Sequence, residues 1–356
     1  MKSYLQGLLL FTVLLGACGK SKESAPTPTP SGQTSAASAP VAKAPLRIGY
    51  SDWPGFVAWE VALQKGWFKQ AGLDVDFVWF EYVPSMEAYT AGKLDAVSVT
   101  NGDALVMGSS GAKSVAILLN DYSNGNDMIV AKRGLTKLTE LKGKKVGVEV
   151  GFVSHLLLIK ALEKEHLSPS DLSLVNVPTD QTPQLLKSGS VDAVVAWQPS
   201  SGQALKEVPG STAIFTSRDV PGLIYDLLAV NPKSLAERRD DWKRLVKVWF
   251  RVVDFLKDPA NAEEAAKLMA GRVGLTPEQY KPLMAGTYFL DLADELERFK
   301  PGDSLASAYF SSKTADEFQV RNDVYKASVP YEQYFDPTLV AEVAKELEQV
   351  AKRAAP

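Results

Sequence analysis

The sequence predicts an α/β protein of two similar lobes, each built on a parallel sheet. Residues 92–97 read Gly-Lys-Leu-Asp-Ala-Val and residues 189–194 read Gly-Ser-Val-Asp-Ala-Val. Each copy follows a short strand pattern, Ile48-Gly49-Tyr50 or Val146-Gly147-Val148, with the glycines of strand and motif 43 and 42 residues apart. A unit that occurs twice indicates a structural repeat, and the cleft between two lobes is a common place for a small ligand.

The first lobe reads as strands that alternate with helices, which is typical of a parallel sheet. An apolar run at 46–50 predicts a buried strand, and the apolar spacing at 57–65 predicts a helix that ends at Gly66. Ser85 is a candidate N-cap for a helix up to residue 91, with Gly92 at its end. Further strands are expected at 75–80, 94–99 and 115–120, and residues 127–131 are expected to lead toward the second lobe.

The second lobe repeats this pattern. Ser154 is a candidate N-cap for a helix up to His166, and a short helix is expected at 181–188. Strands are expected at 144–150, 172–177 and 191–197, followed by a return crossing at 224–230. The predicted ranges are therefore 46–131 and 229–356 for the first lobe and 132–228 for the second.

The remainder of the chain is predicted to be helical. Apolar residues recur at helical spacing and form one stripe, which is more often a core face than a binding surface. The stripe consists of Trp242, Leu245, Val246, Trp249, Val252, Val253 and Leu256. A final amphipathic helix is expected at 339–352.

The N-terminus has the features of an export signal. Lys2 supplies a positive charge, and residues 5–15 form an apolar run that is too short to span a bilayer. Cys18 is the only cysteine, so no internal disulfide is expected, and its position after small residues resembles a bacterial lipobox. Residues 1–18 are thus a predicted lipoprotein signal peptide with lipidation at Cys18, and the Ser-, Thr-, Ala- and Pro-rich residues 19–45 are a predicted flexible tether.

Composition and motifs exclude several function classes. A net charge of −3 without a basic cluster argues against nucleic-acid binding. His155 and His166 do not have the spacing of metal ligands, and no phosphate-binding loop or Gly-x-Ser-x-Gly motif occurs. We therefore expect neither a cofactor nor enzymatic activity, although acid–base catalysis by two carboxylates stays open.

Several of these segments resemble the solute-binding proteins of nitrate/sulfonate/taurine-type ABC importers. They are residues 47–50 (RIGY), 64–75 (QKGWFKQAGLDV), 91–97 (AGKLDAV) and 138–148 (LTELKGKKVGV). The resemblance implies a type II periplasmic-binding-protein fold whose two lobes are joined by two hinge crossings and close on a ligand. It also implies a protein in the periplasm or extracytoplasmic space that delivers its solute to a membrane permease driven by an ATPase. We expect a monomer, because one two-lobed unit is sufficient to bind a solute. The same fold family includes enzymes that make the thiamine pyrimidine, but their cysteine-rich motif is missing here.

Ligands of such folds lie beyond the carboxyl ends of the strands. The candidate ligand-binding residues at these positions are Asp52, Trp53, Glu81, Tyr82, Asn101, Asp103, Asp127, Glu149, Phe152, Trp197, Tyr225 and Asp226. The set is acidic and aromatic and contains no Arg or Lys. It favours a small cation, and above all a planar guanidinium, which can bond two carboxylates while it lies flat against Trp53 or Trp197. Asp95 and Asp192 are left out, because the repeat gives them a structural role at a turn.

A narrower resemblance supports the same ligand. Residues 51–55 (SDWPG), 101–105 (NGDAL) and 120–127 (NDYSNGND) resemble a branch of urea-carboxylase-related transporters that is associated with guanidine use. The alternatives are a sulfonate, taurine or nitrate anion, a thiamine-pyrimidine precursor, an enzyme on this fold, and a tethered sensor. The helix after Ser154 could bind an anion at its N-terminus, although Glu149 lies beside it.

Overall fold

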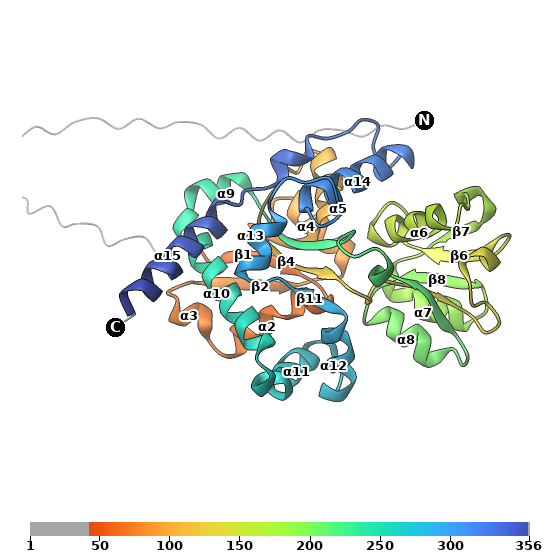
Figure 1. The fold of residues 1–356 in the computed structure, drawn as a ribbon, viewed down its shortest axis with the longest axis horizontal. Coiled ribbons are helices and arrows are strands. Elements are labelled where there is room, and N and C mark those ends of the chain that lie inside the picture. The colour runs from red at the N-terminus through yellow and green to blue at the C-terminus, as the bar shows by residue number, and fades with distance from the viewer. Residues whose placement is uncertain (1–42, 355–356) are drawn as a thin grey trace, which may run out of the picture. The chain divides into compact units, whose positions relative to one another are not determined.

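The computed structural model describes residues 43–354, and the chain from Ala44 onward forms one compact unit. Two β-sheets, each covered by helices, make up this unit (Figure 1). The predicted signal peptide, Cys18 and all of the predicted tether except residues 43–45 lie outside the described residues. Within residues 43–354, no helix combines the length and the apolar character that a membrane span requires.

The first sheet has the strand order β11-β4-β10-β3-β1-β2. Its strands are β1 (Leu46–Tyr50), β2 (Val75–Trp79), β3 (Ala96–Thr100), β4 (Val115–Ser123), β10 (Tyr225–Val230) and β11 (Thr287–Phe289). β1 pairs in parallel with β2 and β3, as expected, whereas β10 runs antiparallel to both β3 and β4.

The second sheet has the order β7-β6-β8-β5-β9 and repeats this arrangement. Its strands are β5 (Met128–Ala131), β6 (Lys145–Val148), β7 (Ser173–Asn176), β8 (Ala193–Ala196) and β9 (Thr212–Thr216). β6 is parallel to β7 and β8, and β5 is antiparallel to β8 and β9. The predicted α/β class and the two-lobed fold are confirmed, and the sheets, which were expected to be parallel, contain antiparallel strands as well as parallel ones. Each sheet is mixed because a crossing strand arrives from the other lobe in the opposite direction.

The chain changes sheets earlier than the sequence suggested at both crossings. β5 was expected in the first lobe, but it is hydrogen-bonded into the second sheet. Tyr225 and Asp226 were expected in the second lobe, but they belong to β10 of the first sheet. The two crossings between the sheets are therefore residues 124–127 and 217–224.

The repeated motif has the same structural role in both lobes. The Asp95 carboxylate accepts a hydrogen bond of 2.9 Å from the backbone N–H of Arg47, and Asp192 accepts the equivalent bond of 2.9 Å from Lys145. Each aspartate thereby ties the strand that it precedes to the start of the neighbouring parallel strand. Their omission from the candidate ligand residues agrees with this geometry.

Fifteen α-helices are described, which cover the sheets or extend beyond them. They are α1 (Pro54–Val57), α2 (Trp59–Gln64), α3 (Trp67–Gln70), α4 (Tyr82–Thr90), α5 (Asn101–Ser109), α6 (Val153–Lys164), α7 (Thr182–Lys187), α8 (Ser200–Glu207), α9 (Pro232–Glu237), α10 (Arg239–Lys257), α11 (Ala262–Ala270), α12 (Pro277–Ala285), α13 (Leu292–Arg298), α14 (Ala308–Arg321) and α15 (Thr338–Ala354). Short 3-10 helices lie at Leu138–Leu141, Pro169–Asp171, Thr179–Gln181, Ser217–Asp219, Pro259–Asn261, Gly271–Val273 and Tyr331–Tyr334.

Two helices begin before the serines that were expected to cap them. Ser85 lies inside α4 and donates its hydroxyl to the carbonyl of Tyr82, while Ser154 is the second residue of α6. The extended backbone of Glu81 and of Phe152 directly precedes each helix and sets its start. The N-terminus of α6 consequently has no side-chain cap of its own.

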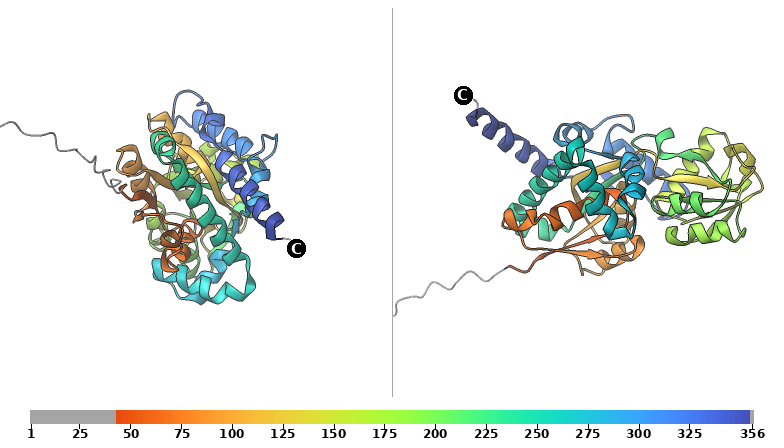
Figure 2. Two further views of the ribbon diagram at one scale, coloured as in Figure 1. Left: turned by 90° about the vertical axis from the view of Figure 1, so that its left-hand side faces the viewer. Right: turned by 90° about the horizontal axis from the view of Figure 1, so that it is seen from below.

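The apolar stripe of α10 is a core face, as predicted. Trp242, Leu245 and Trp249 are fully buried, and the Trp249 ring lies 4.5 Å from that of Trp59 on α2. α10 packs against α2 on one side and α15 on the other, an arrangement that Figure 2 shows from two further directions.

Candidate functional site

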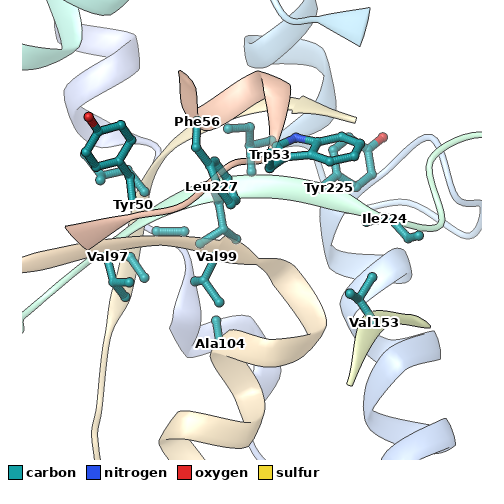
Figure 3. Close-up of a cluster of buried hydrophobic side chains, with 14 of the residues drawn as sticks. Tyr50, Trp53, Phe56, Val97, Val99, Ala104, Val153, Ile224, Tyr225 and Leu227 are labelled. Atoms are coloured by element: carbon teal, nitrogen blue, oxygen red, sulfur yellow. The ribbon is translucent and has the colours of Figure 1, made fainter. Parts of the chain in front are cut away.

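A small cavity lies where the two lobes meet beside the crossings, and we call it the inner chamber. Its walls are Trp53, Phe56, Tyr82, Thr100, Asp127, Val153, Trp197, Ile224 and Asp226. The enclosed volume of about 10 Å³ is room for about one water molecule. Figure 3 shows the apolar part of this region, with Trp53 and Phe56 beside Leu227 of β10, and Ile224 and Val153 further along.

A larger cavity of about 350 Å³ adjoins the inner chamber, and we call it the outer chamber. It is lined by Asp52, Glu81, Tyr82, Val83, Pro84, Glu87, Glu149, Pro178, Thr179, Asp180, Gln181, Trp197 and Ser200. Tyr82 and Trp197 belong to both chambers, and their rings meet edge to face with centroids 5.2 Å apart. Tyr82 comes from the first lobe and Trp197 from the second, so the contact between their rings joins the lobes where both chambers are lined.

Buried carboxyl groups are the main polar feature of the inner chamber. Asp127 and Asp226 are 2% exposed, and the Oδ2 atom of each has no hydrogen-bond donor among the described residues. Burial raises the pKa of Asp127 to about 7 and that of Asp226 well above its ordinary value, and the nearby carboxylates add to the shift of Asp226. Ionised carboxylates without a positive partner are costly in such surroundings, and the raised pKa values reflect this cost.

Asp121 of β4 belongs to this group, although the sequence analysis did not select it. Its side chain is fully buried beside Asp226, and its Oδ1 accepts a hydrogen bond of 3.1 Å from the Trp53 indole Nε1. Burial raises the pKa of Asp121 to about 7. Asp121 was missed because the strand was expected to end at residue 120, whereas β4 continues to Ser123.

Asp103 lies behind the chamber wall and joins the two lobes. Its Oδ2 accepts hydrogen bonds from the Tyr82 hydroxyl at 2.8 Å and from the Val153 backbone N–H, the first of α6, at 3.4 Å. Burial raises the pKa of Asp103 to about 6. A carboxylate of the first lobe thus caps a helix of the second, where a negative charge is favoured by the helix dipole.

The outer chamber is acidic as well. Burial, together with the charge of Glu81, raises the pKa of Asp52 to about 7, and burial raises the pKa of Glu149 to about 7. Thr179 donates its hydroxyl to Glu149 at 3.1 Å, and Glu81 lies near the charge of Asp180. Of the described residues that line either chamber, none is Arg or Lys. Over residues 43–354, no group of three or more His, Cys, Asp or Glu side chains is arranged to hold a metal ion.

The structure brings most of the candidate residues to the chambers. Those that line the inner or the outer chamber are Asp52, Trp53, Glu81, Tyr82, Asp127, Glu149, Trp197 and Asp226. Asp103 does not line a chamber but contacts Tyr82, which does.

Besides Asp103, three further candidate residues line neither chamber. The Asn101 amide donates to the hydroxyls of Ser311 and Ser312, so it is used in packing α5 against α14. The Tyr225 hydroxyl donates to the backbone carbonyls of Leu305 and Ala306, and Phe152 directly precedes α6. Each follows or begins a strand as expected, but its side chain is used elsewhere.

Other lining residues carried little signal in the sequence. Phe56, Thr100, Val153 and Ile224 are apolar or hydroxyl-bearing residues of ordinary core type. Glu87 and Asp180 follow the strand ends by several residues, so a rule that looks only directly beyond each strand does not reach them.

Two named bacterial proteins are similar in sequence to this chain over about two thirds of its length. A Brucella abortus protein that carries the name binding protein is 29% identical over 230 residues, which are 64% of this chain and 70% of that protein. A Brachyspira hyodysenteriae protein named as an ABC transporter periplasmic binding protein is 24% identical over 250 residues, 64% of this chain and 68% of that protein.

Solved structures share the fold. The periplasmic aliphatic sulphonate binding protein SsuA of Escherichia coli superimposes with a TM-score of 0.69 at 20% identity, over 84% of this chain and 100% of SsuA. The desulfurization enzyme DszB superimposes with a TM-score of 0.60 at 15% identity, over 85% of this chain and 99% of DszB. The fold by itself therefore occurs in a binding protein and in an enzyme. The sequence is more specific, since the model of the NMT1-like family matches residues 39–270, and the chain belongs to that family.

Proposed function

We propose that this protein is the solute-binding component of an ABC importer and that it captures a small organic cation, guanidinium, between its lobes. The permease and its ATPase are the partners that receive the solute. The named relatives support the binding-protein role. The choice of a cation depends on the residues of the chambers.

The unpartnered carboxyl oxygens of the inner chamber are the observation that carries this proposal. Asp127 and Asp226 present buried Oδ2 atoms that lack donors, and Asp121 presents a third directly behind them. A guanidinium ion has hydrogen-bond donors in one plane and can bond two carboxylates at once. It would satisfy oxygens that no described side chain satisfies.

The aromatic side chains suit a flat cation. Trp53, Tyr82 and Trp197 are all buried and all line the inner chamber. An aromatic face adds roughly 0.5–2 kcal/mol of cation–π attraction to a desolvated cation. As it stands, the inner chamber has room for about one water molecule, so it would have to widen to hold the four heavy atoms of guanidinium. A ligand with a long chain would require a much larger opening.

An anion is the second candidate, and the named neighbour SsuA favours it, since its name says that it binds aliphatic sulphonates. The N-terminus of α6 is the element of this chain that could hold an anion. Its first N–H is directed at Asp103, however, and the chamber walls are acidic. We therefore rank sulfonate, taurine and nitrate below guanidinium, together with a thiamine-pyrimidine precursor. A reaction catalysed on this fold ranks lower still.

The membrane anchor is a further part of the proposal. A lipid on Cys18, followed by the tether, would hold the binding protein close to its permease, and one two-lobed chain would act as a monomer. Mass spectrometry of the membrane fraction tests the anchor, because a lipidated N-terminal cysteine has a characteristic mass that Cys18→Ala abolishes.

Thermal unfolding of residues 44–356, which form one compact unit, tests the ligand. Guanidinium at millimolar concentration is compared with taurine, nitrate, urea and sodium. A ligand at one hundred times its Kd stabilises a protein by about 2.7 kcal/mol, enough for a shift of a few degrees. We expect a shift with guanidinium that Asp226→Asn abolishes. A shift with taurine or nitrate alone would contradict the cation and keep the binding-protein role.

A further inference from the structure

Asp121 and Asp226 lie directly opposite each other on adjacent strands. They are register partners in the antiparallel pairing of β4 and β10, and side chains at such positions lie on the same face of the sheet. Burial, and after it the charge of Asp121, raises the pKa of Asp226, as expected for two carboxyl groups on facing positions of adjacent strands. Both are almost completely buried.

Few groups are available to neutralise this pair. The Trp53 indole donates to one oxygen of Asp121, and the Oδ2 atoms of Asp121 and Asp226 have no donor in the described part of the chain. No ion pair from a described Arg or Lys reaches either carboxyl. Two ionised carboxylates in contact would repel each other strongly in surroundings of low dielectric.

The other groups that face the pair do not supply positive charge. Asp127 from the crossing and Asp103 from α5 add negative charge. Thr100 lies opposite Asp226 on β3, and Tyr280 of α12 is a neutral phenol near Asp121 whose hydroxyl has no described partner. A proton that bridges the two carboxyls is the simplest species that makes one of them a donor to the other.

We propose that the empty site keeps one proton shared between Asp121 and Asp226, and that the bound cation displaces this proton into solution. The inference rests on the proposed cation site, because Asp226 lines the inner chamber and a cation beside it would stabilise the ionised pair. Cation and proton then exchange with little change in the charge of the chamber. The affinity for the cation should therefore fall as the pH falls, by up to about tenfold per pH unit once the pair is protonated.

Two measurements test the exchange. Carbon-13 NMR titration of the aspartate carboxyls in the ligand-free protein, assigned with Asp121→Asn and Asp226→Asn, reports the proton directly. Titration calorimetry with guanidinium at pH 7, in two buffers of different ionisation enthalpy, reports protons released per cation bound. We expect a shared proton at pH 7 in the free protein and release of about one proton on binding.

Two variants show whether the released proton comes from the Asp121–Asp226 pair or from another buried carboxyl group. In Asp121→Asn the amide donates to Asp226 permanently, so the protein should bind guanidinium with about one proton fewer released. Glu295→Gln is the matched control, because Glu295 is also a fully buried carboxyl with a raised pKa but lines neither chamber. It should release as many protons as the wild type.

The failure of this inference differs from the failure of the proposed function. Guanidinium that binds without proton release, or a pair that is fully ionised at pH 6 in the free protein, would overturn the shared proton and leave the cation site intact. Guanidinium that does not bind would overturn the ligand, while the NMR titration would still decide whether the pair holds a proton.

Discussion

The Trp53 indole Nε1 donates a hydrogen bond of 3.1 Å to Oδ1 of Asp121, which is buried near the C-terminal end of β4 in the first sheet. The bond fixes the indole at the wall of the inner chamber. It also gives Asp121 its single described donor. One side chain therefore both shapes the chamber and offsets part of the charge behind it.

Trp53→Phe should weaken the protein and its ligand binding together. Phenylalanine keeps an aromatic face but leaves the buried Asp121 without its donor, at a loss of roughly 1–3 kcal/mol of stability. Urea unfolding measures the free energy of unfolding, and calorimetry measures the Kd for guanidinium. Trp67→Phe, on α3 and away from the chambers, is the control that should keep the Kd of the wild type. An unchanged Kd in Trp53→Phe would contradict the role of the indole.

Gly55→Ala should disturb the site strongly, although it adds only one methyl group. A Cβ at Gly55 would overlap Oδ2 of Asp121 and approach the Trp53 indole, so the bond between these side chains must break or shift. We expect guanidinium binding to weaken by at least about tenfold, the equivalent of 1.4 kcal/mol. Gly271→Ala is the matched control, since a Cβ there meets no atom within 4 Å. Equal affinities of the two variants would argue against a tightly packed Asp121.

Asp103 should control how long the lobes stay closed on a ligand. Asp103→Ala removes the acceptor of both Tyr82 and the α6 N-terminus, and each lost hydrogen bond contributes about 0.5–1.5 kcal/mol. The dissociation rate of guanidinium in stopped-flow measurements should rise roughly tenfold. Asp103→Asn keeps an acceptor oxygen and should restore most of the effect. If guanidinium dissociated from Asp103→Asn as fast as from Asp103→Ala, the charge of Asp103 rather than its hydrogen bonds would hold the lobes together.

The ligand-free protein should lose stability as the pH rises. Burial raises the pKa values of Asp52, Asp121 and Asp127 to about 7, above the ordinary value of 3.8 that they have in the unfolded chain. These groups favour the folded state fully below pH 4 and lose that contribution as the pH rises through 7. Burial lowers the pKa of His155 to about 4. Its contribution to the stability of the folded state is therefore complete above pH 6.5 and is lost as the pH falls toward 4.

Between pH 6.5 and 7.5 the three carboxyls outweigh His155, because the unfolded chain binds at most about half a proton at this histidine there. The Tm of the free protein should fall across this window at constant ionic strength, and saturating guanidinium should reduce the fall. A Tm that rises across the window would contradict the unneutralised carboxyl cluster.

The sequence was most informative where a pattern occurs twice. The Gly-x-[Leu/Val]-Asp-Ala-Val copies predicted two equivalent lobes, and Asp95 and Asp192 make the same bond in each. The strand direction of β10 could not be predicted, because its apolar residues fit a parallel or an antiparallel neighbour equally well. A local sequence pattern predicts which side of a strand is buried, whereas the strands that it pairs with depend on the path of the whole chain.

The chambers were predictable at the residues that directly follow a strand. Asp52, Trp53, Glu81 and Trp197 were found in this way and line the cavities. The rule failed for Asn101 and Tyr225, because it gives the position of a residue but not the direction of its side chain. It also missed Asp121, whose importance depends on Asp226 opposite it on a strand more than one hundred residues later.

The most direct test of the cation site is a crystal structure of residues 44–356 grown with guanidinium at pH 8, where the buried carboxyls are largely ionised. We predict flat density in the inner chamber, hydrogen-bonded to Asp127 and Asp226 and stacked on Trp53 or Trp197. An empty chamber at saturating guanidinium, or a sulfonate held at the N-terminus of α6 in a parallel crystal with taurine, would contradict the cation site.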